Sequence, residues 1–240
     1  MQRCLWCSER FYQQAKWRFI FGREKEVKIC NRCESGLSPI KKGAPICRGC
    51  GRSLAELEPR FCQGEHCTDC LRWEESDVWR GVLVKNRSLY SYDSFLKEWM
   101  ARFKFRGDVI LADALGDQFR ALYEKECPNH LIVPIPLSDE RLYERGFNQA
   151  EVLARLIAEP LPALMRTEHE QKQSKKNRSE RLALMHQPFA INEELRGEIS
   201  GQKVVLIDDI YTTGATVRQA AVVLKRNGAA SVSSLTLARG

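Results

Sequence analysis

Cysteines are concentrated at the start of the chain, and their spacing limits what this part of it can fold into. Nine of the ten cysteines lie within the first 70 of 240 residues. Eight of them form four Cys-x-x-Cys pairs; each pair can place two thiolates on one tight turn, and two such turns complete a tetrahedral zinc site. The predicted zinc ligands are Cys4, Cys7, Cys30, Cys33, Cys47, Cys50, Cys67 and Cys70. Disulfides are disfavoured because no secretory signal pattern opens the chain.

The pairing of these turns has two solutions. Between Cys7 and Cys30 lie 22 residues, and between Cys50 and Cys67 lie 16, so sequential pairing predicts two stacked zinc ribbons. Cross-bracing of the first pair with the third uses the same residues and stays open. Cys62 and His66 are alternative ligands of the second site, although unligated surface residues are the commoner outcome. Because so small a module buries little core, we expect the metal to supply its folding energy.

The remaining composition is that of an ordinary globular protein, with 43% hydrophobic and 29% charged residues. The abrupt end of the cysteine-rich stretch predicts a domain boundary, with a zinc-ribbon module at 1–75 and a second domain at 76–240. No apolar run is long enough to span a bilayer, so we expect a soluble, cytoplasmic protein. A net charge of +7 permits a polyanionic partner without requiring one.

Alternating strand and helix patterns predict an α/β fold for the second domain. An apolar run at 203–207, a helix at 214–226 and a closing strand at 232–237 make a right-handed βαβ unit in a parallel sheet. Upstream, the patterns predict an antiparallel pair at 78–84 and 89–92, helices at 94–105, 110–125 and 149–158, and strands at 131–134 and 163–165. Residues 171–181 are predicted to form a polar, basic loop.

The segment from Val204 to Thr216 carries the densest chemistry. A buried strand ends in Asp208 and Asp209, at the sheet edge where ligands of parallel sheets bind. A hydroxyl-rich turn at the start of a helix follows, and backbone amides at such a turn bind phosphate. The two carboxylates can accept hydrogen bonds from ribose hydroxyls, or lie near a Mg²⁺ held by pyrophosphate. Simple capping of the helix by a threonine is the alternative, and the full pattern disfavours it.

Several stretches carry a family resemblance. Ile207 to Thr216 resembles the phosphoribosyl pyrophosphate (PRPP) signature of the type I phosphoribosyltransferases. Arg141 to Ala150, which reads RLYERGFNQA, is similar to a block of the ComF (GntX-like) family. Val133 to Pro136, Phe103 to Gly107 and the N-terminal double zinc ribbon match that family too. The resemblance therefore spans essentially the whole chain.

The resemblance implies a phosphoribosyltransferase-like domain that binds PRPP with Mg²⁺. It implies that Asp208 and Asp209 contact the ribose hydroxyls. The residues implied to bind the 5-phosphate are Thr212, Thr213, Gly214, Ala215 and Thr216. The pyrophosphate side of the cleft is implied to contain Pro134, Ile135, Pro136, Leu137, Arg141, Arg145 and Gln149. For Arg145, a surface salt bridge is the alternative.

Two functions fit such a site. The first is Mg²⁺-dependent transfer of a phosphoribosyl group from PRPP to an unidentified nucleotide or nucleic-acid acceptor; no residue is assigned as a general base. The second, implied by the ComF resemblance, is binding without turnover in natural genetic transformation, with incoming single-stranded DNA handled on the cytoplasmic side of the uptake machinery. The implied partners are single-stranded DNA and other cytoplasmic transformation proteins, such as the competence helicase of the same operon family.

Two basic stretches are candidates for contact with DNA. Six cations oppose two acids between 85 and 107, and five oppose one between 172 and 181, so each stretch attracts phosphate. The DNA-contact candidates are Lys85, Arg87, Arg102, Lys104, Arg106, Lys172, Lys175, Lys176 and Arg178. Interleaved aromatic and basic residues at 11–19 add a candidate stacking surface for single strands. Solvated helix faces and packing on a neighbour are the ordinary alternatives.

Overall fold

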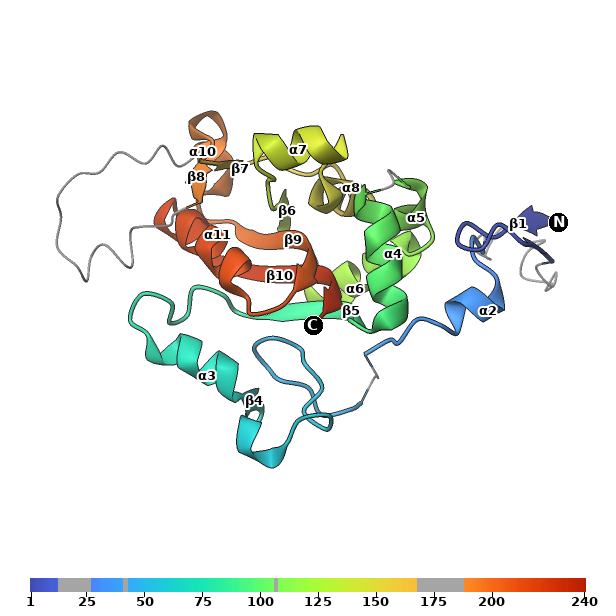
Figure 1. The fold of residues 1–240 in the computed structure, drawn as a ribbon. Helices are drawn as coiled ribbons and strands as arrows, with labels where there is room; N and C mark the ends of the chain where they lie inside the picture. The colour runs from blue at the N-terminus through green and yellow to red at the C-terminus, as the bar shows by residue number, and fades with distance from the viewer. Residues whose placement is uncertain (13–26, 41–42, 106–107, 168–187) are drawn as a thin grey trace.

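A four-stranded sheet forms the centre of the second domain in the computed structural model, which describes residues 1–12, 27–40, 43–105, 108–167 and 188–240. The strand order is β5-β10-β9-β6, and every neighbouring pair is parallel (Figure 1). The strands are β5 (Asn86–Ser91), β6 (Leu131–Pro134), β9 (Lys203–Tyr211) and β10 (Ser231–Arg239). A parallel sheet with crossover helices confirms the predicted α/β class.

Helices cover both faces of this sheet. They are α4 (Ser94–Phe105), α5 (Ile110–Asp113), α6 (Gly116–Glu126), α8 (Gln149–Arg155) and α11 (Ala215–Arg226). Val205 and Ile207 of β9 belong to the core shared with α4, α5, α6 and α8, whereas Val204 and Leu206 belong to the core shared with α11. Because all four side chains are fully buried, this strand reads as a continuous apolar run.

Short elements complete the second domain. Helix α7 (Asp139–Arg145) follows β6, and a small antiparallel sheet pairs β7 (Leu164–Arg166) with β8 (Phe189–Ile191). A 3-10 helix at Glu193–Leu195 and α10 (Arg196–Ile199) lead into β9. No helix among the described residues has the length and apolar character needed to cross a membrane.

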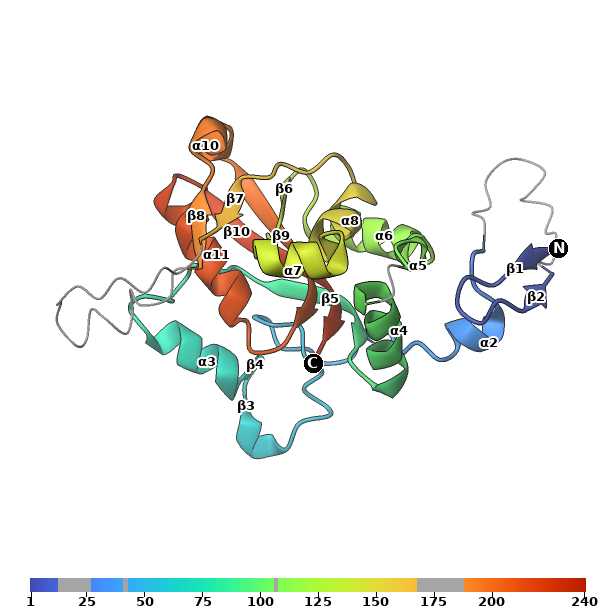
Figure 2. The same cartoon turned by 45° about the horizontal axis from the view of Figure 1, so that its top comes forward.

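The cysteine-rich segment forms two small modules. The first contains β1 (Gln2–Arg3), β2 (Arg10–Phe11) and α2 (Asn31–Glu34), and lies beyond α4 at one end of the molecule (Figures 1 and 2). The second contains a 3-10 helix at Pro59–Phe61, β3 (Cys62–Gln63), β4 (His66–Cys67) and α3 (Thr68–Glu75). The two modules are set apart, so the expectation that they stack on each other is wrong.

The central sheet is what separates the modules. Trp6 of the first module joins the core on the α4 side, where its ring stacks on that of Trp99 with the centroids 4.9 Å apart. Cys47 and Cys50 of the second module join the core on the α11 side. Each module therefore buries its apolar surface against a different face of the α/β domain rather than against the other module.

The antiparallel pair expected at 78–92 is also wrong. Only β5 forms there, and it runs parallel to β10. The polar residues around Asn86 suggest a turn in the sequence, yet Asn86 is fully buried. Its amide nitrogen donates to the Cys50 carbonyl at 3.1 Å, and its amide oxygen accepts from the Ser234 hydroxyl at 2.9 Å. These tertiary hydrogen bonds allow a polar residue to occupy a buried strand.

The other expected elements are present with shifted bounds. The helix expected at 110–125 is divided into α5 and α6, and the one expected at 149–158 ends at Arg155. The strand expected at 163–165 is found as β7. The basic loop expected at 171–181 lies outside the described residues.

Candidate functional site

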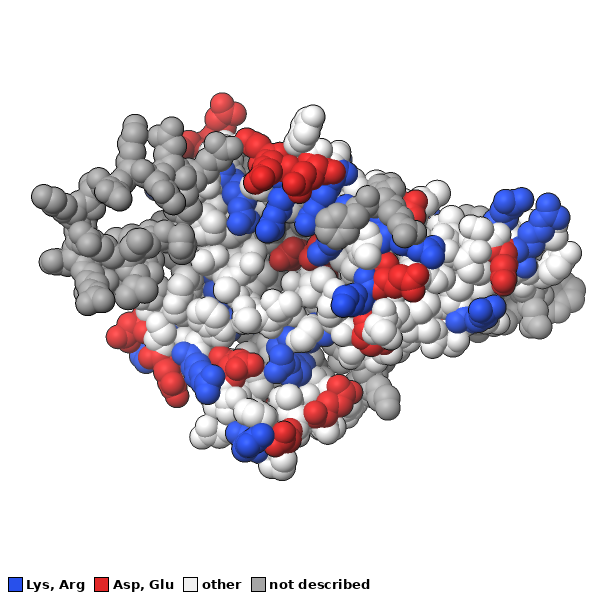
Figure 3. Space-filling model, in the orientation of Figure 1, with Lys and Arg blue, Asp and Glu red and all other residues white. Residues whose placement is uncertain are grey.

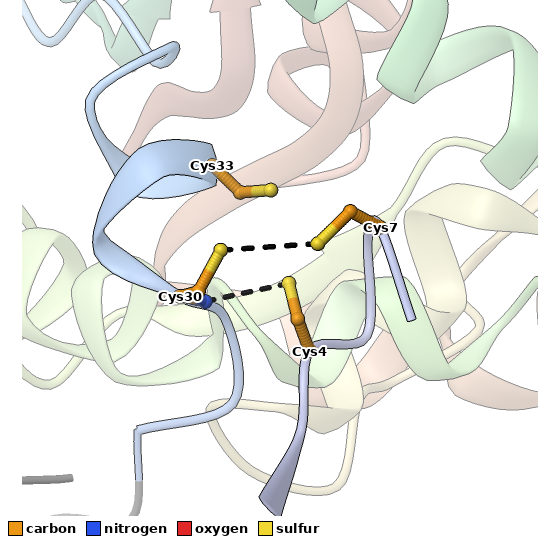
Figure 4. A group of neighbouring side chains, drawn as sticks. All are labelled: Cys4, Cys7, Cys30 and Cys33. Atoms are coloured by element: carbon orange, nitrogen blue, oxygen red, sulfur yellow. Dashed lines mark hydrogen bonds between the residues drawn. The ribbon is translucent and has the colours of Figure 1, made fainter. Parts of the chain in front are cut away.

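The eight paired cysteines form two clusters, grouped sequentially along the chain. Within each cluster the four sulfur atoms all lie within 4.8 Å of one another. The Cys7 and Cys30 sulfurs are 3.8 Å apart (Figure 4), and those of Cys50 and Cys67 are 3.7 Å apart. Four zinc–sulfur bonds of about 2.3 Å in a tetrahedron place the sulfurs about 3.8 Å apart, so both donor sets fit zinc. The clusters are Cys4, Cys7, Cys30 and Cys33, and Cys47, Cys50, Cys67 and Cys70.

Neither alternative ligand belongs to a cluster. The Cys62 thiol donates to the Leu54 carbonyl at 3.8 Å, and His66 lies on β4 without joining the four sulfurs of the second group. A set of four cysteines fills all the positions of a tetrahedral ion, which is the arrangement of structural zinc sites. The ion would hold each module together and contribute its folding free energy.

The loop between β9 and α11, residues 212–214, has the form of a phosphate-binding turn, and we call it the phosphate loop. Thr212 and Thr213 are exposed, and the Thr213 hydroxyl accepts from the Ala215 amide at 3.3 Å. Gly214 precedes the first residue of α11 with a φ of +84°, a conformation that favours glycine. The first amides of a helix have no partner within the helix, so the start of this 12-residue helix makes the turn attractive to an anion.

Gly214 is also a point of close approach. A methyl group there would clash with the Tyr211 ring and hydroxyl and would lie 2.5 Å from an Arg218 nitrogen. We expect Gly214→Ala to lower the free energy of unfolding by about 1–3 kcal/mol and to weaken phosphate binding. Thermal unfolding and a phosphate titration measure both effects. Gly197→Ala is the matched control, since nothing lies within 4 Å of a methyl group there, and an equal loss in both variants would contradict the account.

Buried side chains behind the phosphate loop hold it in place. Arg218, only 2% exposed, donates to the Tyr211 hydroxyl at 2.6 Å, and its guanidinium lies 4.8 Å from the centre of the Trp73 ring. The indole nitrogen of Trp73 donates to the Thr213 carbonyl at 3.0 Å. Trp73 belongs to α3, three residues after Cys70, so the second cysteine module contacts the phosphate loop directly.

Arg239 forms a second connection between that module and the loop. One of its terminal nitrogens donates to the Cys50 sulfur at 3.3 Å, and the other donates to the Tyr211 carbonyl at 3.2 Å. Arg239 is 6% exposed and comes from the end of β10. Charge-assisted hydrogen bonds of this kind are stronger than neutral ones, so the second cluster and the phosphate loop are expected to be mechanically coupled.

Asp208 and Asp209 lie at the carboxyl end of β9, as predicted, but the surroundings of Asp208 differ from those of Asp209. Asp209 forms an ion pair with Lys104 of α4, and both side chains are largely buried. Burial, followed by the charge of Asp209, raises the pKa of Asp208 to about 7. The pKa of Arg166 is lowered, first by burial and then by the charge of Arg141, while Asp208 opposes that shift. Arg141, Arg166 and the two acids therefore share one electrostatic environment.

The two acids are expected to have opposite effects on stability. The raised pKa of Asp208 means that the native state retains a proton that the unfolded chain releases between about pH 4 and 7, so stability falls as the pH rises through this range. Asp208→Asn should therefore raise the free energy of unfolding by about 1–3 kcal/mol at pH 8, and by less at pH 5. Asp209→Asn should lower it, because Lys104 loses its partner. Denaturant unfolding of both variants at both pH values tests this; equal signs at pH 8 would contradict it.

The predicted pyrophosphate side surrounds the end of β6. The Ile135 amide donates to the Ile207 carbonyl at 2.9 Å, which joins this segment to β9. Arg145 donates to Gln149 at 2.8 Å, and Gln149 is only 1% exposed. Gly146 ends α7 with a φ of +75°, and Asn148 caps α8. Pro134 ends β6, Pro136 and Leu137 lie on the connection between β6 and α7, and Arg141 lies in the first turn of α7. The RGFNQ block at 145–149 forms the turn from α7 to α8, and the Asn148 side-chain amide joins it to the β6–α7 connection by donating to the Ile135 carbonyl at 3.0 Å.

The described DNA-contact candidates all have protein partners. Lys85 and Arg87 pair with Glu126, at 2.9 and 3.6 Å. Arg102 lies 3.9 Å from the centre of the Trp6 ring, and Lys104 pairs with Asp209. Arg106, Lys172, Lys175, Lys176 and Arg178 lie outside the described residues, as does most of the aromatic stretch at 11–19. On the face shown in Figure 3, basic side chains gather beneath α7 around a small acidic patch.

Sequence reasoning missed Trp73, Arg166, Arg218 and Arg239. Arg218 carries a usable signal, because it lies between Val217 and the alanines at 220 and 221 in the apolar part of α11. A charged residue within such a part of a helix needs a buried partner. Trp73, Arg166 and Arg239 have no comparable signal, since their partners come from distant parts of the chain.

The fold and the phosphate loop define a phosphoribosyltransferase-type domain joined to two cysteine modules. Residues 143–240 match the phosphoribosyl transferase domain family. The chain is 39% identical to the competence protein ComFC of Bacillus subtilis (strain 168), over 98% of this chain and 94% of that protein. It is 32% identical to ComFC of Streptococcus pneumoniae (strain ATCC BAA-255 / R6), over 99% and 100%, and 26% identical to competence protein F of Haemophilus influenzae (strain ATCC 51907 / DSM 11121 / KW20 / Rd), over 88% and 90%. The chain belongs to the ComFC family of competence proteins.

Proposed function

We propose that this chain is a competence protein that binds PRPP at the phosphate loop and handles single-stranded DNA during natural transformation. The proposal rests on the close placement of two acids and a threonine turn at the end of β9. Two acids with different electrostatic surroundings, Asp208 and Asp209, precede an exposed threonine turn at the start of a 12-residue helix. A ribose 5-phosphate presents diol hydroxyls and a phosphate to such a site, and each group has a chemical counterpart there.

Zinc and Mg²⁺ have different roles in this proposal. The two cysteine clusters would hold structural zinc, since each offers four sulfur ligands. Mg²⁺ would accompany PRPP, held mainly by pyrophosphate oxygens, with the β9 acids nearby. The basic side chains of Arg141 and Arg166, which share the environment of Asp208, would face the pyrophosphate end of the ligand.

Mg²⁺-dependent phosphoribosyl transfer is the second candidate, and the cations near the acids favour it. Departure of pyrophosphate would separate charge, so catalysis would rest on positioning and on electrostatic stabilisation. Arg141 and Arg166 would stabilise the leaving group, while Asp208 and Asp209 would hold the ribose. No described side chain is assigned as a general base, so the acceptor would need little activation or would supply its own base.

Handling of single-stranded DNA rests on family membership and on charge. In the ComFC family the cytoplasmic side of the uptake apparatus would supply the strand, and a competence helicase is the proposed neighbour. A protein that binds DNA phosphates through Lys and Arg must lose affinity for the strand as the salt concentration rises. Titration of a labelled single strand by fluorescence anisotropy at a series of salt concentrations should give a linear decrease of log affinity with log salt concentration. A flat response would exclude this part of the proposal.

A further inference from the structure

A pocket of about 670 Å³ lies between the second cysteine module and the phosphate loop. Its lining includes Arg52, Arg72, Trp73, Trp79, Thr212 and Thr213. This volume lies within the usual range for sites that bind a small molecule or part of a larger ligand. The lining combines two indole rings with the two exposed threonines of the phosphate loop, so a ligand in the pocket also reaches the candidate phosphate site.

The aromatic wall is held firmly. The Trp73 and Trp79 rings meet edge to face, with centroids 5.4 Å apart and planes at 85°. Trp73 is fixed by its hydrogen bond to the Thr213 carbonyl and by Arg218 over its ring. Both indoles are half-buried, so each keeps some surface for a ligand. A rigid aromatic surface binds flat rings with little loss of conformational entropy.

Two arginines lie beside this wall, together with Asp69, which pairs with one of them. Arg52 donates to the Gly240 carbonyl at 3.1 Å and pairs with Asp69, which keeps its guanidinium at the rim. Arg72 is exposed on α3. Indole rings next to arginines and to a phosphate-binding turn are the components of single-strand sites, where bases stack on aromatic rings and cations follow the backbone.

We propose that this pocket binds a nucleobase of a single-stranded oligonucleotide, stacked on Trp79, while a backbone phosphate of the same strand occupies the phosphate loop. The proposal rests on the function proposed above and specifies its ligand. PRPP and the strand would then place a phosphate group at the same position, and the rest of each ligand would contact different residues. The ribose diol of PRPP reaches the acids of β9, and the strand reaches the tryptophans.

Two probes with the same backbone charge isolate the stacking contribution. A 5′-phosphorylated oligothymidylate and a 5′-phosphorylated abasic strand of equal length are titrated into the full chain. The wild-type protein should bind the thymidylate strand about 5- to 150-fold more tightly than the abasic one. Trp79→Ala should lose most of this preference and Trp79→Phe should retain part of it. PRPP affinity should change little in either variant, since Trp73, which bonds to the Thr213 carbonyl and packs on Arg218, stays in place.

Tyr143→Ala is the matched control, because Tyr143 is 92% exposed on α7 and does not line the pocket. It should bind both strands as the wild-type protein does. If Trp79→Ala and Trp79→Phe keep the full preference for bases, the pocket assignment is overturned and the proposed function stands. If the wild-type protein binds neither strand, both the assignment and the DNA half of the proposed function fail. Thermal unfolding of each variant shows whether a loss reflects the pocket or the fold.

Discussion

Cys50→Ser is expected to lower the affinity for PRPP by at least about tenfold, even though Cys50 lies outside the phosphate loop. The Cys50 sulfur accepts from Arg239, and Arg239 donates onward to the Tyr211 carbonyl directly before the loop. Loss of one of the four sulfurs would release the metal and with it the folding free energy of the second module. Both Arg239 and Trp73 would then lose the arrangement that holds the loop.

A variant of the first cluster provides the control for this effect. Cys33→Ser removes the same chemical group from a cluster with the same four-sulfur donor set. The first module packs on α4 through Trp6 and has no described hydrogen bond to the phosphate loop. Calorimetric titration with PRPP should therefore show a much smaller loss for Cys33→Ser than for Cys50→Ser. Equal losses would mean that the modules affect the site only through general stability.

The double variant Asp208→Asn, Asp209→Asn is expected to lower PRPP affinity by about 100-fold or more. Asp209, and Asp208 once the pH exceeds its pKa of about 7, are proposed to accept charge-assisted hydrogen bonds from ribose hydroxyls, and such bonds contribute about 1.5–3 kcal/mol each. Affinity for single-stranded DNA should remain nearly unchanged, because a deoxyribose backbone lacks the diol. Any release of pyrophosphate from PRPP should also disappear. Fluorescence anisotropy with a labelled strand and a coupled pyrophosphate assay provide the two readouts.

The same variant separates the two candidate functions in the cell. If it still supports full transformation, PRPP turnover has no part in that process, and the catalytic candidate falls. If transformation is lost while DNA affinity is retained, the ribose-phosphate site is required. Lys104→Gln is a useful comparison, because it removes the ion pair with Asp209 and leaves both acids in place.

The parts of the fold that could be predicted are those set by local patterns. A continuous apolar run predicts the strand at 203–207, and helical periodicity predicts the helix beginning near Gly214 and leads to the closing strand. The structure has these elements as β9, α11 and β10. The four Cys-x-x-Cys pairs predict two metal sites, whereas their sequential grouping needed the structure, because spacing alone permits cross-bracing. The strand expected at 89–92 overlaps β5, but its start at Asn86 and its parallel pairing were missed, since buried Asn86 depends on partners 36 and 148 residues away.

The sequence alone places the candidate ligand-binding residues next to one another, but it does not reveal the side chains that support them. Asp208, Asp209 and the threonine turn are contiguous, so one segment of sequence reveals them. The supporting side chains bond to residues far away in the sequence: Trp73 of α3 donates to Thr213, and Arg239 of β10 donates to Cys50. Likewise, Lys104 reads as a surface cation in the sequence, and only the tertiary fold brings it to Asp209.

Direct titration of the full chain with PRPP, with and without Mg²⁺, tests the central claim that the end of β9 is a ribose-phosphate site. Calorimetry should detect saturable binding that strengthens with Mg²⁺ and is lost in the double Asn variant. A parallel assay for pyrophosphate then decides between binding and turnover. Absence of saturable binding at PRPP concentrations up to about 1 mM, in protein that unfolds cooperatively, would contradict the claim.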